Sequence, residues 1–341
     1  MVMNVSETGM FIIAASVMGV LSASGADVPV PVIKIAQFKG DRLAAISYTF
    51  DDGTLGHYKV AAPLLEKYGF CGTFFVVPGR ILDEPTTEAT FVDAKGNTRS
   101  RPVSWKEWRE LSARGHEVAN HGLDHKKLPG LIDEEVAQQV QEAQRLISAK
   151  VGVSPLTFCY PGNGRDERVR EIVMQTHIAA SEKEDGFGGT NFTAALANRV
   201  VDRAIKSGGQ EVIMIHAVAE PGYQPISEEM LDAHLKYVAS VRDKIWVDTF
   251  ANVSRYVRER ETAQIEITEQ TANQVSFRLT CPLDSKRFNS ALTCVLMIGT
   301  PMTTASAQYD TSGMIVPVDV TNDKLMLNVV PGTEPITILW K

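Results

Sequence analysis

The sequence has few cysteines, no hydrophobic run long enough to cross a bilayer and no excess of basic residues. Its four cysteines, at positions 71, 159, 281 and 294 of 341, are too sparse for a disulfide framework and lack metal-ligand spacing. Cys281 and Cys294 lie in one strand-rich region, where they either pair or pack as buried thiols. The net charge of −7 argues against a nucleic-acid or anionic-membrane partner. It favours a neutral or cationic substrate over a strongly anionic one.

An apolar stretch at residues 10–23 is shorter than a membrane span. Small residues follow it, at a position suited to cleavage before Asp27. We therefore expect a signal peptide at residues 1–26, a secreted or periplasmic location and no membrane span in the mature chain. Because no Lys or Arg precedes the stretch, a buried N-terminal helix is the alternative.

Residues 43–260 alternate short apolar runs with segments of helical periodicity, which predicts a parallel sheet flanked by helices. The predicted strands are Leu43–Phe50, Gly72–Val77, His116–Ala119, Thr157–Tyr160, His177–Ala180, Val212–His216 and Ile245–Val247. A barrel is the natural closure of such a sheet, with its chemistry at the carboxyl ends of the strands. The polar segment 78–102 is predicted as a long loop, either functional or a tolerated surface insertion.

After residue 260 the helical periodicity ends, and short strands separated by Gly and Pro follow. We expect a catalytic domain at 27–261 and a small antiparallel β domain at 262–341. The β domain is interpreted first as a stabilising cap and second as a carbohydrate-binding module.

Polar residues that could bind a metal or take part in catalysis follow three of the predicted strands. Asp51 and Asp52 end the first strand, a pattern that on its own also suits a plain turn. His121 and His125 follow the third strand, and on a helical turn this spacing projects both imidazoles from one face. His216 closes a later apolar strand.

Asp52, His121 and His125 together form a two-histidine, one-carboxylate set, which leaves a coordination position open as catalytic metal sites require. Each piece alone is weak evidence, but all of them are predicted at the same rim of one barrel. The other histidines, at positions 57, 116, 177 and 234, lack such neighbours and are interpreted as structural or surface residues.

Four ordered motifs within residues 43–260 resemble those of the polysaccharide deacetylases of carbohydrate esterase family 4, which share the chitooligosaccharide-deacetylase homology domain. The motifs are Thr49–Gly53, Gly115–His125, Phe158–Gly162 and Met214–His216. The resemblance implies an α/β fold, a distorted (β/α)7 barrel, here followed by the small C-terminal antiparallel β domain.

The resemblance also implies a role for each site residue. Asp52, His121 and His125 would hold a divalent metal, zinc first, with Co, Ni or Mn as alternatives. Asp51 would be the general base and His216 the general acid. The amide of Gly162 would bind the oxyanion, while Tyr160 and Met214 would line the substrate pocket.

Three features depart from the family pattern. Cys159 stands where the family has an arginine that pairs with the base, and Gly122 replaces the usual Ser or Thr after the first ligand histidine. The family's Asp-and-Trp motif is not clearly present, although Glu182, Asp185 and Arg199 lie near its place. The substrate of the best-known members is therefore not transferred to this chain.

The predicted function is hydrolysis of acetyl groups from an acetylated poly- or oligosaccharide, N-linked before O-linked. The alternatives are an O-acetyl polysaccharide esterase of the acetylxylan type and a non-catalytic carbohydrate-binding protein on the same scaffold. The sugar, the linkage, the native metal and the oligomeric state do not follow from the sequence.

Overall fold

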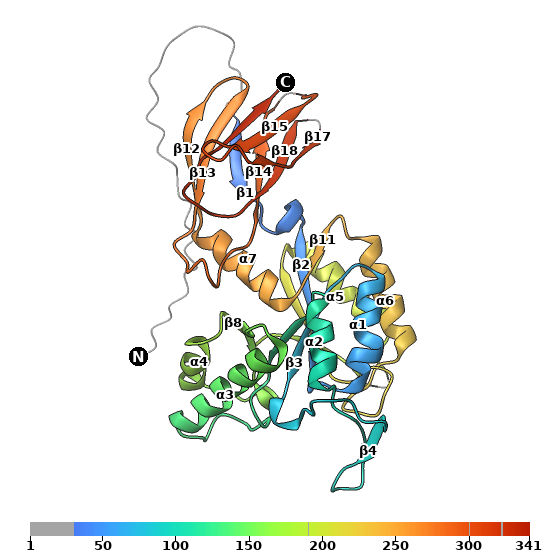
Figure 1. The fold of residues 1–341 in the computed structure, drawn as a ribbon. Helices are drawn as coiled ribbons and strands as arrows, with labels where there is room; N and C mark the ends of the chain where they lie inside the picture. The colour runs from blue at the N-terminus through green and yellow to red at the C-terminus, as the bar shows by residue number, and fades with distance from the viewer. Residues whose placement is uncertain (1–30, 190, 300, 322) are drawn as a thin grey trace, which may run out of the picture.

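The computed structural model describes residues 31–189, 191–299, 301–321 and 323–341, so the predicted signal peptide lies outside the described residues. Within these ranges, no helix combines the length and the apolar character that crossing a bilayer demands. Figure 1 shows two units along one axis, a barrel with surrounding helices and a smaller β domain at one of its ends.

The barrel is a sheet of parallel strands in the spatial order β8-β7-β6-β3-β2-β10-β9, and β11 pairs with the first residues of β2. Its strands are β2 (Ala44–Asp51), β3 (Thr73–Val76), β6 (Glu117–Asn120), β7 (Thr157–Cys159), β8 (Ala179–Ser181), β9 (Asp185–Phe187), β10 (Gln210–Ile215) and β11 (Ile245–Val247). Only three residues separate β8 from β9, yet these strands form the two edges of the sheet. Residues 179–187 therefore join both edges. The structure confirms the predicted distorted (β/α)7 barrel.

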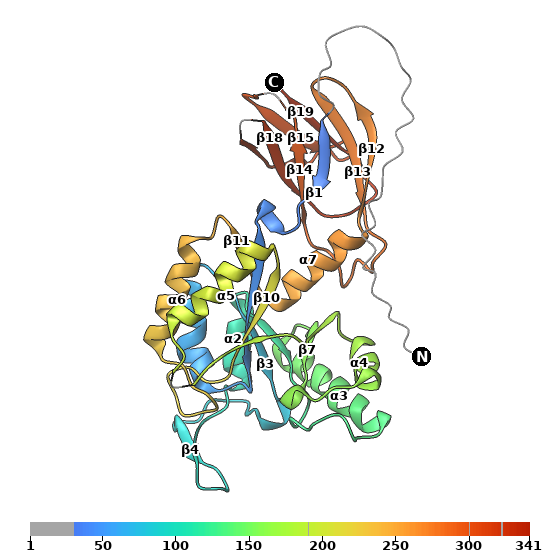
Figure 2. The same cartoon turned by 180° about the vertical axis from the view of Figure 1, so that it is seen from behind.

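Helices cover the outside of the barrel, as Figures 1 and 2 show. They are α1 (Ala62–Lys67), α2 (Trp105–Ala113), α3 (Asp133–Val151), α4 (Glu167–Met174), α5 (Ala194–Ser207), α6 (Glu228–Ser240) and α7 (Phe250–Thr262). A capping box begins α2, since the Ser104 side chain accepts a hydrogen bond from the backbone of Glu107 and the Glu107 side chain accepts one from the backbone of Ser104. Ser227 caps α6, because its side chain accepts a hydrogen bond from the backbone of Met230.

The strand period of two decides which side chains enter the barrel. On β2, Tyr48 and Phe50 belong to the apolar core under the helices. Asp51 therefore faces the opposite side, toward the barrel interior. A separate small cluster inside the barrel includes Phe75 and Cys159. The alternation of side chains along each strand thus directs Asp51 and Cys159 into the interior of the barrel.

The β domain consists of two antiparallel sheets, ordered β1-β14-β18-β17 and β12-β13-β19-β15-β16. Its strands are β1 (Val32–Ile35), β12 (Gln264–Gln270), β13 (Gln274–Thr280), β14 (Leu292–Met297), β15 (Ala305–Tyr309), β16 (Ile315–Val316), β17 (Val318–Thr321), β18 (Lys324–Val329) and β19 (Ile336–Trp340). One correction to the expected domain limits follows. Residues 32–35, which we had placed in the catalytic domain, pair with β14 and belong to this sandwich.

The β domain packs against the amino ends of the barrel strands through α7. The hydroxyl of Tyr256 donates to the carbonyl of Ala36 and accepts from the backbone of Thr293. Trp246 and Tyr256 share one apolar cluster with the sandwich core. The contact places the sandwich beside the amino ends of the barrel strands, away from their carboxyl ends (Figure 2).

The segment 78–102 is partly ordered, in contrast to the predicted loop. It contains a two-stranded hairpin of β4 (Thr90–Val92) and β5 (Thr98–Ser100), which projects from the barrel in Figure 1. The backbone of Ser100 donates to the carbonyl of Pro221 and fixes the base of the hairpin. Cys281 and Cys294 are free thiols, and Cys294 is buried. The structure therefore shows no disulfide bond between these two cysteines, which was one of the two alternatives left open.

Candidate active site

A pocket of about 390 Å³ lies at the carboxyl ends of the barrel strands. All eight residues to which the resemblance gave a role line it: Asp51, Asp52, His121, His125, Tyr160, Gly162, Met214 and His216. Cys159, Asn163 and Tyr223 complete the lining. The sequence prediction therefore placed these residues together correctly, although their chemical roles stay predictions.

Three side chains at this pocket have the geometry of a metal site. Asp52 Oδ1 lies 4.0 Å from His121 Nε2 and 3.4 Å from His125 Nε2. The same Oδ1 is buried and has no hydrogen-bond partner among the described residues. An unpartnered buried carboxylate oxygen that faces two imidazole nitrogens fits a divalent transition ion.

A second set of donors, Asp51, His121 and Cys159, also lies within 4.8 Å. It shares His121 with the first set, and all three of its members are buried. The Asp52 set opens to the pocket through partly exposed Asp52 and His125. That access favours the Asp52 set as the one that a substrate can reach.

The two histidines do not lie on a helical turn, which corrects our expectation. Residues 121–127 form an irregular loop in which His125 has φ +57° and Gly122 has φ +73°. Gln139 of α3 clamps this loop, because its side chain accepts from the backbone of Asp124 and donates to the Asp124 carboxylate. A Cβ on residue 122 would lie 3.3 Å from Pro161, so the positive φ and the crowding together explain Gly122. Tertiary contacts, rather than helical spacing, bring the two imidazoles together.

The ring of His121 is oriented by a hydrogen bond of 2.9 Å between Nδ1 and the carbonyl oxygen of Cys159. This contact directs Nε2 toward Asp52, as outer-shell partners of metal-binding histidines commonly do. Burial lowers the pKa of His121 to about 4, so the ring is neutral near pH 7 and available as a ligand. Burial alone would raise the pKa of Asp52, but its interactions with His121 and His125 outweigh burial and hold the pKa below its ordinary value.

Asp51 is buried beside this site. Its Oδ1 has no hydrogen-bond partner among the described residues, and its Oδ2 accepts a weak hydrogen bond from the Cys159 thiol at 3.4 Å. Burial raises the pKa of Asp51 well above its ordinary value, and the negative charges of Glu184 and Asp52 raise it further. Cys159 thus occupies the place beside the base where the family has an arginine. Arg199, which was named near the place of the Asp-and-Trp motif, lies exposed on α5.

His216 follows β10 and faces Asp52 across the pocket. Burial lowers its pKa, while the nearby charge of Asp52 acts in the opposite direction. Its carbonyl lies 2.6 Å from Nε2 of the buried His57, which therefore holds the end of β10 in place. Tyr223 packs its ring edge-to-face on the His216 ring, with the ring centroids 5.0 Å apart. The sequence analysis missed Tyr223, for which an aromatic residue in a loop after a motif strand was the available signal.

Two of the three charged residues named near the missing family motif are engaged in other contacts. Glu182 binds Arg170 at 2.9 Å, and Asp185 pairs with Arg203. Glu184, which the sequence analysis did not name, lies close enough to affect the charge of Asp51 and His216. Its Oε1 is buried without a partner among the described residues.

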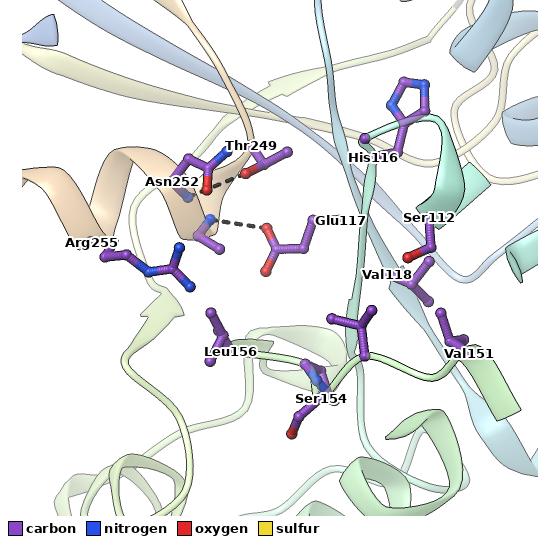
Figure 3. Close-up of a pocket in the computed structure, with 14 residues that line it drawn as sticks. Ser112, His116, Glu117, Val118, Val151, Ser154, Leu156, Thr249, Asn252 and Arg255 are labelled. Atoms are coloured by element: carbon purple, nitrogen blue, oxygen red, sulfur yellow. Dashed lines mark hydrogen bonds between the residues drawn. The ribbon is translucent and has the colours of Figure 1, made fainter. Parts of the chain in front are cut away.

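A second pocket, of about 180 Å³, lies at the opposite end of the barrel. Figure 3 shows Glu117 and Arg255 pointing into it from β6 and α7, and a hydrogen bond from the backbone of Ala251 to the Glu117 carboxylate. The motif residues with assigned roles all lie at the other end. This second pocket is therefore interpreted as part of the barrel floor.

Residues 40–181 match the sequence model of the family described as "Polysaccharide deacetylase". The chain is similar to gellan lyase from a Bacillus species, with 24% identity over 297 residues that cover 76% of this chain and 11% of that protein. It is also similar to chitin deacetylase 1 from Cryptococcus neoformans, with 27% identity over 147 residues that cover 42% of this chain and 27% of that protein. The matched regions are thus minor parts of both relatives.

Among solved structures, the peptidoglycan deacetylase PdaC from Bacillus subtilis matches with 20% identity and a TM-score of 0.44, covering 64% of this chain and 93% of that chain. The family match includes Asp51, Asp52, His121 and His125. The similarity to the polysaccharide deacetylase family thus extends over residues 40–181, which are less than half of the chain.

Proposed function

We propose that this protein is a metal-dependent hydrolase that removes acetyl groups from a saccharide, and that its substrate is an N-acetylated poly- or oligosaccharide. The observation that carries the proposal is a pair of buried carboxylate oxygens without hydrogen-bond partners among the described residues, both at one pocket. Asp51 and Asp52 each have a buried carboxylate oxygen with no hydrogen-bond partner in the described part of the chain, and both residues line the pocket with His121 and His125. Such costly groups persist where they serve binding or catalysis.

The residues divide the chemistry among themselves. Asp52, His121 and His125 would hold a divalent ion, zinc before Co, Ni or Mn, and when bound it supplies a Lewis acid that polarises the acyl carbonyl. Asp51 accepts a proton from the attacking water as the new carbon–oxygen bond forms. His216 donates a proton to the leaving amine as the carbon–nitrogen bond breaks, which yields acetate and the free amino sugar.

Gly162, Tyr160 and Met214 would position the acetyl group. Gly162 lines the pocket with φ +58°, and its amide is the proposed donor to the oxyanion. Tyr160 packs its ring edge-to-face on Phe158 beneath the pocket, which fixes the wall that the substrate contacts. Met214 from β10 contributes apolar surface for the methyl group.

The test is acetate release by the purified full chain, before and after removal and return of zinc, cobalt, nickel or manganese. The panel contains N-acetylated glucosamine oligomers and O-acetylated xylan oligomers at equal acetyl concentration. We expect metal-dependent release that is faster from the N-acetylated set. Preference for the O-acetylated set would favour the esterase, and no release from either set by metal-loaded protein would contradict the enzyme.

The proposal includes export, because a polysaccharide of this kind lies outside the cytoplasm. It is supported by the apolar residues 10–23 and the small residues that follow them. Fractionation of the producing cells, with the N-terminus of the exported protein sequenced, is the measurement. Retention of the uncleaved chain in the cytoplasm would contradict export.

A further inference from the structure

Lys127 lies at the edge of the candidate active site, over the loop that carries Gly162. A Cβ placed on Gly164 would lie 3.7 Å from Cβ of Lys127, and one placed on Gly162 would lie 3.3 Å from its Cε. The lysine side chain therefore runs from residue 164 toward residue 162. Because Gly162 lines the pocket, the ammonium group, one bond beyond Cε, lies at the rim of the pocket.

The backbone around Lys127 is held firmly. Leu128, the next residue, is fully buried in the cluster between α3 and α4. Pro129 packs against Gly164, where an added Cβ would lie 3.2 Å from the proline ring. His125, two residues earlier, belongs to the proposed metal set. The position of Lys127 is therefore fixed by the same loop that positions a ligand histidine.

Arg80 lies on the neighbouring side of this loop. It ends the short turn Pro78–Arg80 after β3, and the backbone of Gly79 donates to the carbonyl of Leu123 at 2.9 Å. A Cβ on residue 79 would lie 2.5 Å from the Asp124 carboxylate, so the turn and the loop are in direct contact. Arg80 and Lys127 thus flank one stretch of loop, and both are exposed.

Among the described residues, these two side chains have no directly bonded partner, although the charge of Arg80 helps to lower the pKa of Asp52. Among the described residues, neither side chain takes part in a hydrogen bond or an ion pair, whereas the other cations of this rim are engaged. Lys126 lies 3.9 Å from Asp124, and Arg165 lies 3.8 Å from Glu182 and donates to the carbonyl of Glu182.

The carboxylates of the rim are also occupied. Asp124 is bound by Gln139, and Glu182 by Arg165 and Arg170. Outside the proposed metal site and its adjacent base, the unpaired charge of the described residues at this edge is therefore positive, although the whole chain carries −7. Exposed charges act over about 10 Å at ordinary salt, so only a group bound at the pocket is affected.

We propose that Lys127, with Arg80 beside it, binds a carboxylate of an acidic saccharide next to the acetylated sugar that enters the pocket. The inference rests on the proposed deacetylase function and names its substrate class. It also revises the expectation from net charge alone, which favoured a neutral or cationic substrate. A flexible, unpaired ammonium at the mouth of a site recognises an anionic group by a charge-assisted hydrogen bond.

The experiment uses a matched pair of substrates. One is an oligosaccharide that alternates N-acetylglucosamine and glucuronic acid, and the other is the same oligosaccharide after reduction of its carboxyl groups to alcohols. We expect the wild-type protein to show a higher kcat/KM for the acidic form. Lys127→Ala should lower the acid-to-neutral ratio of kcat/KM about tenfold, mainly through KM, as loss of a charge-assisted contact predicts.

Two variants control the interpretation. Lys127→Arg should restore the ratio, because it keeps the charge. Lys126→Ala removes the adjacent lysine, which is near Asp124, and should leave the ratio at the wild-type value. Equal kcat/KM for both substrates in the wild type, or a fall in kcat for both substrates without a change in their ratio, would overturn the proposal.

A binding measurement separates this inference from the proposed function. If the metal-loaded protein releases no acetate from either oligosaccharide, the deacetylase proposal fails for them, and titration calorimetry with the acidic oligosaccharide still tests Lys127. Weaker binding by Lys127→Ala, by about tenfold, would support the carboxylate site. Identical affinity of wild type and variant, or no binding by the wild type, would refute it.

Discussion

Two inward-facing carboxylates at opposite ends of the barrel have opposite surroundings. Glu117, at the start of β6, accepts hydrogen bonds from the hydroxyls of Thr73 and Thr157 at 2.8 and 2.6 Å and from the backbone of Ala251 at 2.9 Å. Asp51, at the end of β2, accepts only the thiol hydrogen bond of Cys159 and leaves its other oxygen without a partner among the described residues. Glu117 thus accepts three hydrogen bonds from the surrounding protein, whereas Asp51 accepts a single weak one.

The comparison shows which observation separates a structural carboxylate from one that is left available for binding or catalysis. Burial raises the pKa of both groups, so the direction of the shift does not distinguish them. The number of donors does, because an unsatisfied buried oxygen costs stability that only a ligand or a reaction can justify. The donors of Glu117 come from β3, β7 and α7, so this carboxylate joins the floor of the barrel.

The largest effect is expected from His121→Ala, which removes the residue shared by both possible donor sets at the candidate active site. Two remaining ligands hold a divalent ion poorly, so metal content and acetate release should be lost together. Metal analysis and turnover of the folded variant are the measurements, with Glu117→Gln as the control that keeps the metal. Full metal occupancy in His121→Ala would remove this residue from the site.

A smaller effect is expected from Asp51→Asn, which tests the under-satisfied carboxylate directly. Turnover should fall on the order of 10²-fold or more, the usual scale for a lost general base, while the metal stays bound. Because Asp51 has only the weak thiol hydrogen bond of Cys159 to lose among the described residues, the urea midpoint should change little. Loss of metal in Asp51→Asn together with its retention in Asp52→Asn would show that the two adjacent carboxylates have exchanged roles.

Much of this arrangement could be predicted from the sequence, because the decisive patterns are local. Alternation along β2 and β10 places Asp51 and His216 at strand ends, and parallel strands bring those ends to one edge. The position of β1 could not be predicted, because its pairing joins Val32 to Met297 across the whole chain. A four-residue strand with an ordinary apolar pattern carries no signal of so distant a partner.

The geometry of parts of the candidate active site could not be predicted from the sequence either. The spacing of His121 and His125 suggested a helical turn, but the contacts of Gln139 with the loop fix a different backbone. The path of Lys127 over Gly162 depends on packing between two loops that lie more than thirty residues apart. Such tertiary contacts override local preference, which explains why the residues were found and the geometry was not.

The smallest effect concerns the saturated carboxylate and its dependence on pH. Burial is the main cause that raises the pKa of Glu117 above its ordinary value of 4.5, and its hydrogen bonds oppose the rise. A raised pKa means that the folded protein binds this proton more tightly than the unfolded chain does. The stability contribution is therefore complete below about pH 4.5 and is lost as the pH rises through the folded-state pKa.

Gln at this position has no such ionisation, so the stability advantage of the wild type over Glu117→Gln should shrink from pH 4.5 to pH 8. Urea unfolding of both proteins across this range measures it. An advantage that grows with pH would mean that the three hydrogen bonds favour the carboxylate more strongly than burial disfavours it.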